Sequence, residues 1–319
     1  MARRLAALTS LILLAGSFPA EAQTEKLKVA VAQRGFWNSS FIEFGLRQGF
    51  FKDEGLDIEI FYTEGGASTL TPVIAGSLDI AMTNGTLGVI AAFSKGAPVK
   101  IISAEATGAP DAFWYSRPES NIKTIKDAEG KTVAFSSPGS STNLIILQLI
   151  NQENVKPKLT ATGGAPGTLT QVMSGQIDVG WAVPPFVLQH LAEKRLQIIA
   201  KGSDVKALAN QTIRVNVANA NALKTKRDAF VRFMRALSRS IDWAYTDDRS
   251  LDMYAEVAKV PRELAKRTRD EFYDKASLQL AEVRGLDLTL QQALEFKYIT
   301  SPIPVEKVRS ELIDILYKP

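Results

Sequence analysis

Short apolar runs alternate with longer stretches of helical periodicity through the first two thirds of the chain. The first run, 29–32, precedes a polar loop and a helical stretch over 41–54. Brief continuous apolar runs between helices are typical of buried parallel strands. The pattern therefore predicts a series of βαβ units, with strands at 29–32, 57–62, 78–83 and 99–104 and helices at 41–54, after Gly65-Gly66 and at 86–95.

An internal repeat organises this series. Residues 65–81 and 163–180 share Gly-Gly-Ala, Thr-Leu-Thr, and later Val, Gly and Asp in the same order. The period of about 100 residues is too long for a solenoid and matches a whole lobe. The second copy predicts strands at 133–136, 158–162, 177–182 and 196–200 and helices at 140–153 and 185–193. We therefore expect two α/β lobes, each with an open, doubly wound parallel sheet.

Two further segments connect the lobes. The aromatic run at 112–116 and the alternating run at 212–218 predict two crossing strands. Beyond residue 221 apolar residues recur at helical spacing, which predicts helices packed on the first lobe. The expected division is 23–117 with 214–319 for lobe 1 and 118–213 for lobe 2.

The N-terminal residues predict export. Arg3 and Arg4 precede an apolar stretch over 5–18, and Ala20-Glu21-Ala22 forms an A-x-A site. This pattern indicates a cleavable signal peptide at 1–22, so we expect a periplasmic protein. The chain has no cysteine, which leaves no site for a lipid anchor.

The amino-acid composition excludes several kinds of catalytic and metal-binding site. Without cysteine there are no disulfides, thiolate nucleophiles or Cys-ligated zinc sites. The single histidine, His190, is interpreted as a helix-surface residue, so neither a metal site nor a cofactor is expected. The net charge of +4 comes without a Lys/Arg run interleaved with aromatics, so no nucleic-acid partner is expected. We expect a monomer.

Candidate ligand contacts lie where strands end, because open α/β sheets bind ligands outside the carboxyl ends of their strands. The loop at 33–40 offers an aromatic beside hydrogen-bonding groups, and the hydroxyl-rich loop at 137–143 precedes a helix whose free N–H groups suit an anion. The same residues could cap helices instead. Asp79 and Asp178, paired by the repeat, are interpreted as a duplicated turn feature rather than as catalytic carboxylates. The candidate ligand-binding residues are Gln33, Trp37, Asn38, Ser39, Gly66, Asn84, Gly85, Thr86, Ser140, Ser141, Thr142, Trp181, Pro184 and Arg214.

Four motifs carry a family resemblance: QGFFKDEGLDIE at 48–59, GSLDIA at 76–81, IKTIKDAEGKTVA at 122–134 and GQID at 175–178. With them the chain resembles the nitrate/sulfonate/bicarbonate/taurine group of ABC-importer solute-binding proteins. The resemblance implies a type II periplasmic-binding-protein fold, lobe closure on the ligand and docking onto a membrane permease. The chain is also similar to the thiamin-pyrimidine synthases, whose functional cysteines and histidines have no match here.

The resulting hypothesis is a non-enzymatic solute-binding protein that takes a small anionic organic ligand, of sulfonate or carboxylate type, and delivers it to an ABC importer. Its mechanism would be hinge closure, in which contacts from both lobes favour the closed state. Two alternatives stay open: an enzyme on the same fold and the ligand-binding subunit of a sensor. Nitrate, bicarbonate and a pyrimidine also remain candidate ligands.

Overall fold

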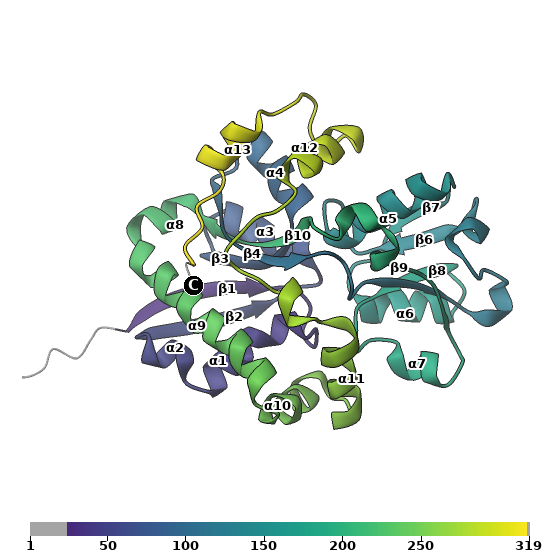
Figure 1. Ribbon diagram of the computed structural model, residues 1–319, viewed down its shortest axis with the longest axis horizontal. Coiled ribbons are helices and arrows are strands. Elements are labelled where there is room, and N and C mark those ends of the chain that lie inside the picture. Colours follow the sequence, from purple (N-terminus) through teal and green to yellow (C-terminus); the bar gives the residue numbers. More distant parts are fainter. Residues whose placement is uncertain (1–23, 318–319) are drawn as a thin grey trace, which may run out of the picture.

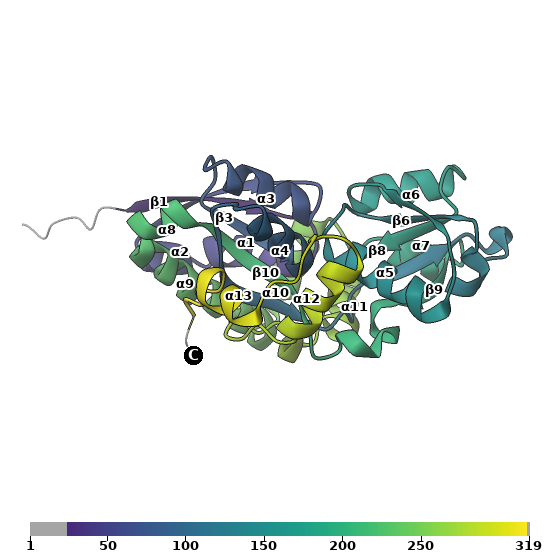
Figure 2. The same cartoon turned by 90° about the horizontal axis from the view of Figure 1, so that it is seen from above.

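Two five-stranded sheets, one in each lobe, form the centre of the molecule (Figure 1). The computed structural model describes residues 24–317, so the expected signal peptide lies outside the described residues. The strand orders are β2-β1-β3-β10-β4 and β7-β6-β8-β5-β9. Seen from above, the lobes lie side by side with the C-terminal helices along one of them (Figure 2). The expected class, two α/β lobes joined by two crossing segments, is confirmed.

The sheets are mixed rather than purely parallel. Each has four parallel strands and one antiparallel strand, which lies at the fourth position. In the first sheet the strands are β1 (Glu25–Val31), β2 (Leu56–Tyr62), β3 (Ile80–Gly85), β4 (Val99–Thr107) and antiparallel β10 (Thr212–Asn219). In the second they are β6 (Thr132–Phe135), β7 (Lys158–Ala161), β8 (Val179–Ala182), β9 (Gln197–Lys201) and antiparallel β5 (Phe113–Ser116).

The antiparallel strands are the ones that enter each sheet from the other lobe. β5 follows β4 but pairs with β8 and β9, and β10 follows β9 but pairs with β3 and β4. The chain therefore crosses between the sheets at 108–112 and at 202–211. By sheet membership the second lobe begins at Phe113, a few residues before the boundary expected after residue 117, and the first lobe resumes at Thr212 rather than at 214.

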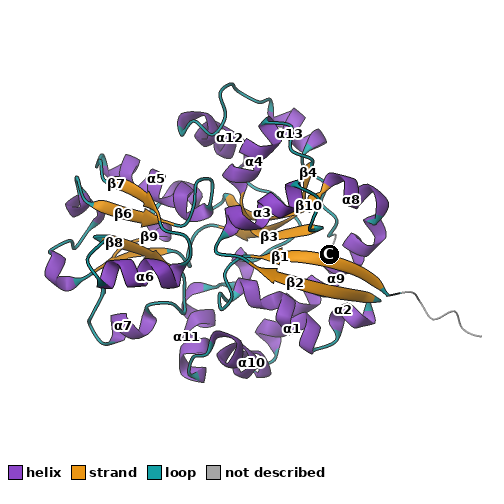
Figure 3. Ribbon diagram, turned by 180° about the vertical axis from the view of Figure 1, so that it is seen from behind, coloured by secondary structure: helices purple, strands orange, loops and turns teal. Residues whose placement is uncertain are grey.

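Helices cover both faces of each sheet (Figure 3). The stretch expected as one helix over 41–54 is two, α1 (Phe41–Arg47) and α2 (Phe50–Asp53). Gly49 between them has φ +79°, a left-handed conformation that ends a helix and favours glycine. The other helices of the two copies are α3 (Gly66–Ile74), α4 (Thr86–Ser94), α5 (Ser141–Glu153), α6 (Ala165–Met173) and α7 (Leu188–Ala192).

The C-terminal third is helical, as its periodicity predicts. Its helices are α8 (Ala220–Thr225), α9 (Arg227–Thr246), α10 (Arg249–Ala258), α11 (Arg262–Phe272), α12 (Leu286–Glu295) and α13 (Val305–Glu311). α9 packs on the first lobe, where Phe233 stacks on Phe51 with ring centroids 5.3 Å apart. Short 3-10 helices occupy Asn38–Ser40, Pro118–Ser120, Ile125–Ala128, Gly202–Asp204, Lys206–Leu208 and Lys275–Ser277.

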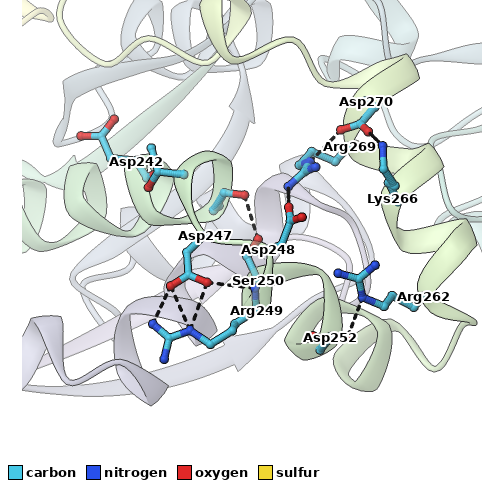
Figure 4. A network of polar contacts seen from close by, with 12 residues as sticks. Asp242, Asp247, Asp248, Arg249, Ser250, Asp252, Arg262, Lys266, Arg269 and Asp270 are labelled. Carbon is cyan, nitrogen blue, oxygen red and sulfur yellow. Dashed lines mark hydrogen bonds and ion pairs between the residues drawn. The ribbon is translucent and has the colours of Figure 1, made fainter.

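Ion pairs join the ends of α10 and α11 on the surface (Figure 4). Arg262 contacts Asp252 at 2.7 Å, and Arg269 contacts Asp248 at 3.2 Å. Exposed pairs of this kind contribute little stability individually. Over residues 24–317, none of the helices has the length and apolarity needed to cross a membrane.

The paired aspartates form the duplicated turn expected from the repeat. The Asp79 carboxylate accepts the N–H of Lys28 at 2.8 Å, and the Asp178 carboxylate accepts the N–H of Thr132 at 2.8 Å. Burial alone would raise the pKa of Asp178, but the N–H and hydroxyl donors of Thr132 outweigh burial and lower it. Each carboxylate ties the start of its third strand to the first strand of the same lobe.

Candidate functional site

A small cavity with both apolar and polar lining residues lies between the lobes, at the carboxyl ends of their strands. Ala32 follows β1, Gly85 ends β3, Ser136 follows β6 and Val183 follows β8, and all four line it. Its volume is about 30 Å³, where a single water needs about 10–15 Å³. With the lobes this close, the cavity admits a compact group of few atoms.

Seven of the residues predicted as ligand contacts line this cavity. They come from the loop after β1, the end of β3, the start of α5, β8 and β10, and so from both lobes. They are Asn38, Gly85, Ser140, Ser141, Thr142, Trp181 and Arg214.

Trp37 lies elsewhere, in the aromatic core of the first lobe. Its indole N–H donates to the Tyr245 hydroxyl at 3.0 Å, and its ring meets that of Tyr254 at 4.9 Å. The side chain is fully buried. The aromatic expected to form the ligand wall is therefore a core residue, and Phe36 occupies the wall in its place.

Most of the other predicted residues also lie outside the cavity lining. The Thr86 hydroxyl donates to the carbonyl of Thr212 at 2.8 Å, and Asn84 lines a neighbouring cavity of about 180 Å³ that shares Gly85. Pro184 precedes a cis peptide bond with Pro185. The described residues of this group are Gln33, Trp37, Ser39, Asn84, Thr86 and Pro184. Gly66 is described only as the first residue of α3.

Sequence reasoning missed half of the lining. Ligands bind at the carboxyl ends of strands, so the residues that directly follow β1, β6 and β8 could have been predicted. Asp111 lies in a segment that crosses between the lobes, and no pattern in the sequence marks it. The missed residues are Ala32, Phe36, Gly65, Thr83, Asp111, Ser136 and Val183.

Arg214 is the one cationic side chain among the cavity's lining residues, and it is only 4% exposed. Its Nη1 donates to the Asp111 carboxylate at 2.7 Å and its Nε to the Ser141 hydroxyl at 2.9 Å. Burial would lower the pKa of Arg214, but the carboxylates of Asp111 and Glu105 outweigh burial and raise it. A guanidinium has five N–H donors, so these two bonds leave three for other partners.

Unpartnered polar oxygen atoms lie on the first-lobe side. Asn38 Nδ2 donates to Glu105 Oε1 at 2.7 Å. Among the described residues, Asn38 Oδ1, Glu105 Oε2 and Thr83 Oγ1 are buried without a hydrogen-bond partner. Burial raises the pKa of Glu105, which favours its neutral form. Buried polar atoms without partners are rare in proteins and point to a missing water or ligand.

The second lobe presents the N-terminus of α5. The Ser140 hydroxyl accepts the N–H of Asn143 at 3.2 Å and therefore caps the helix, while Thr142 Oγ1 accepts the N–H of Ser136 at 3.0 Å. The N–H groups of a helix's first turn have no partner within the helix, and the helix dipole favours negative charge there. For α1 the capping alternative is wrong, because Ser40 makes no side-chain cap bond.

Neither His190 nor a metal-binding cluster contributes to the cavity. His190 lies on α7 and contacts Arg195. From residue 24 to 317, no three His, Cys, Asp or Glu side chains are placed to hold a metal ion together.

Comparisons with known proteins agree with this architecture. The family model described as NMT1/THI5 like matches residues 38–250. The match to a curated relative, "Putative binding protein YtlA" of Bacillus subtilis (strain 168), is 26% identical over 111 residues, 34% of this chain. The chain spans only about a third (33%) of that relative's length.

Two solved structures share the fold over most of both chains. The periplasmic aliphatic sulphonate binding protein SsuA from Escherichia coli is 17% identical, with a TM-score of 0.69 over 89% of this chain and 91% of that chain. The periplasmic nitrate-binding protein NrtA from Synechocystis PCC 6803 is 12% identical, with a TM-score of 0.74 over 91% of this chain and 86% of that chain. At these identities the likeness establishes the fold alone.

Proposed function

The chain belongs to the NMT1/THI5-like family, and on that premise we propose that it is a periplasmic solute-binding protein without catalytic activity. It captures a small ligand between its lobes and delivers it to the membrane permease of an ABC importer. The observation that carries the proposal is the cavity between the lobes, which is lined by Asn38 and Thr83 with their unpartnered buried oxygens, by Arg214 and by the first turn of α5. The names of SsuA and NrtA as binding proteins support it.

The ligand carries a compact anionic group, of sulfonate or carboxylate type. Its oxygens would accept hydrogen bonds from Arg214 and from the first turn of α5, where Ser141 and Thr142 line the cavity. Asp111 already balances the charge of Arg214, so the site selects an anion by directed donors rather than by excess positive charge. The small volume favours a short ligand.

The carboxylates near the cavity favour binding over catalysis. Asp111 is held by Arg214, and Glu105 is held by Asn38, while burial raises the pKa of Glu105. General acid–base catalysis needs a group free to exchange its proton with the substrate. Both of these carboxyl groups instead fix the positions of side chains that line the cavity.

A thermal-shift screen of residues 23–319 tests the proposal. The panel contains taurine, alkanesulfonates, nitrate, bicarbonate, aromatic carboxylates and pyrimidines. A ligand at 100 times its Kd should stabilise the protein by about 2.7 kcal/mol. A hit recovered chemically unchanged supports a binding protein, whereas a converted hit would establish the enzyme alternative. A response to pyrimidines alone would contradict the anionic ligand.

Thr83→Val locates the site once a hit is known. The Thr83 hydroxyl lines the cavity without a protein partner, so the valine, which is nearly the same shape, removes a ligand contact but no internal hydrogen bond. We expect affinity to fall about tenfold, the effect of one lost hydrogen bond to a charged group. The control is Thr170→Val on the exposed face of α6. Equal affinity in the two variants would place the ligand elsewhere.

A further inference from the structure

One residue of the second lobe, Gly139, forms hydrogen bonds with two elements of the first lobe through its N–H and its carbonyl. The carbonyl of Gly139, in the loop before α5, accepts the N–H of Gly88 in α4 at 3.1 Å. The N–H of the same Gly139 donates to the Tyr298 hydroxyl, just after α12, at 2.9 Å. Nearby, Asn151 of α5 donates to Glu295 of α12 at 3.0 Å.

These contacts require glycine. A Cβ at residue 88 would lie 2.9 Å from the Gly139 oxygen, and one at residue 85 would lie 2.3 Å from it. A Cβ at residue 139 would lie 2.8 Å from the Gly88 Cα, and Gly139 also has φ +79°. Such distances are below ordinary van der Waals contact. The backbones of the two lobes therefore meet only because neither carries a side chain here.

We infer that Gly88, Gly139 and Tyr298, which we call the glycine clasp, are positioning residues that set how far the lobes close over the cavity. None of the three lines the cavity, so they act on the closure equilibrium rather than on the ligand. Across the lobes the three residues make three hydrogen bonds, from Gly88 to Gly139, from Gly139 to Tyr298 and from Tyr298 to Asn143. A contact of this size is small enough for the binding energy of a ligand to shift the balance between open and closed states. The role in ligand capture rests on the proposed function.

The variant Gly88→Ala tests lobe closure without destabilising the fold. Gly88 lies in the first turn of α4 and is not among the residues with positive φ, and alanine is the better helix former. The variant should therefore fold at least as stably as the parent while its methyl group pushes against the Gly139 oxygen. Gly167→Ala in α6 is the matched control, because its Cβ would meet only the Thr162 oxygen at 3.9 Å.

Cross-linking measures closure without any ligand. The chain has no cysteine, so Asn151→Cys and Glu295→Cys place a single thiol pair across the lobes. A short bismaleimide should join them within one chain at a rate set by the closed population. We expect this rate to fall about tenfold with Gly88→Ala, which is the scale of an overpacking penalty, and less with Tyr298→Phe. Gly167→Ala should leave it unchanged.

Three outcomes would overturn the proposed role of the glycine clasp, two of them in the cross-linking assay. One is an equal cross-linking rate in the Gly88→Ala and Gly167→Ala backgrounds, and the other is no cross-linking in the parent pair. Loss of folding in Gly88→Ala, seen as a lowered melting temperature, would also contradict it. Because no ligand enters this assay, a negative result here is distinct from a failed ligand screen.

Discussion

Removing Asp111 should expose how strongly the cavity depends on its buried ion pair. Asp111→Ala leaves the Arg214 guanidinium buried without the carboxylate that lies 2.7 Å away. The two side chains are 3% and 5% exposed, so bulk solvent does not replace the lost carboxylate. Breaking a buried pair in this way costs about 3–5 kcal/mol.

Glu105 reduces that cost. Burial raises the pKa of Glu105, but Arg214 lies close enough to act against this shift. With Asp111 gone, the guanidinium would draw Glu105 into its charged form and recover part of the lost compensation. We therefore expect a loss near the lower end of the range, about 3 kcal/mol.

Urea unfolding of residues 23–319 measures the loss. Asp53→Ala, which breaks the exposed pair with Arg239, is the control and should cost under about 1 kcal/mol. Anions of the ligand panel should stabilise Asp111→Ala more than the parent, because they supply the missing charge. A loss below about 1 kcal/mol in Asp111→Ala would refute the buried pair, and equal stabilisation of both proteins by anions would refute Arg214 as their partner.

Three further changes test the surroundings of the cavity. Because the folded chain binds a proton at Glu105 more tightly than the unfolded one, Glu105 contributes stability that is lost as pH rises from about 4.3. In urea titrations the stability difference between the parent and Glu105→Gln should therefore shift in favour of the variant as pH rises through this range, and a pH-independent difference would contradict the shift. Trp37→Ala should lower the free energy of unfolding by about 3–5 kcal/mol in the same assay, with ligand affinity retained in the folded fraction. A variant that keeps its stability but loses ligand affinity would show that Trp37 contacts the ligand. Ser140→Ala should cost about 1 kcal/mol by removing the α5 cap, and no loss would contradict the cap.

The two-lobed fold could be predicted because the signals for it are local and occur twice. Strand and helix periodicity needs only short windows, and the repeat at about 100 residues gives the lobe length. The antiparallel insertion of β5 and β10 could not be predicted in this way. Their partners β8 and β3 lie far along the chain, and pairing is decided when both sheets form.

Part of the candidate site could also be predicted, because its signals are local in the sequence. Strand ends and the hydroxyl-rich turn before α5 are visible in sequence, and they bring Asn38, Gly85 and Ser141 to the cavity. Whether Trp37 is wall or core depends on Tyr245 and Tyr254, more than 200 positions away. Long-range packing of this kind leaves no local pattern.

The repeat also explains why function has to be sought where the two copies differ. The shared Asp79 and Asp178 make the same bond to the first strand of each lobe, and so maintain the frame. The residues facing the cavity are different in the two copies: unpartnered acceptors at Asn38 on one side, and the N-terminus of α5 on the other. Under the proposed function, a ligand bridging them would contact each lobe through different chemistry, so neither lobe alone would complete the site. Binding would then favour the closed arrangement, because only there would both sets of groups find partners.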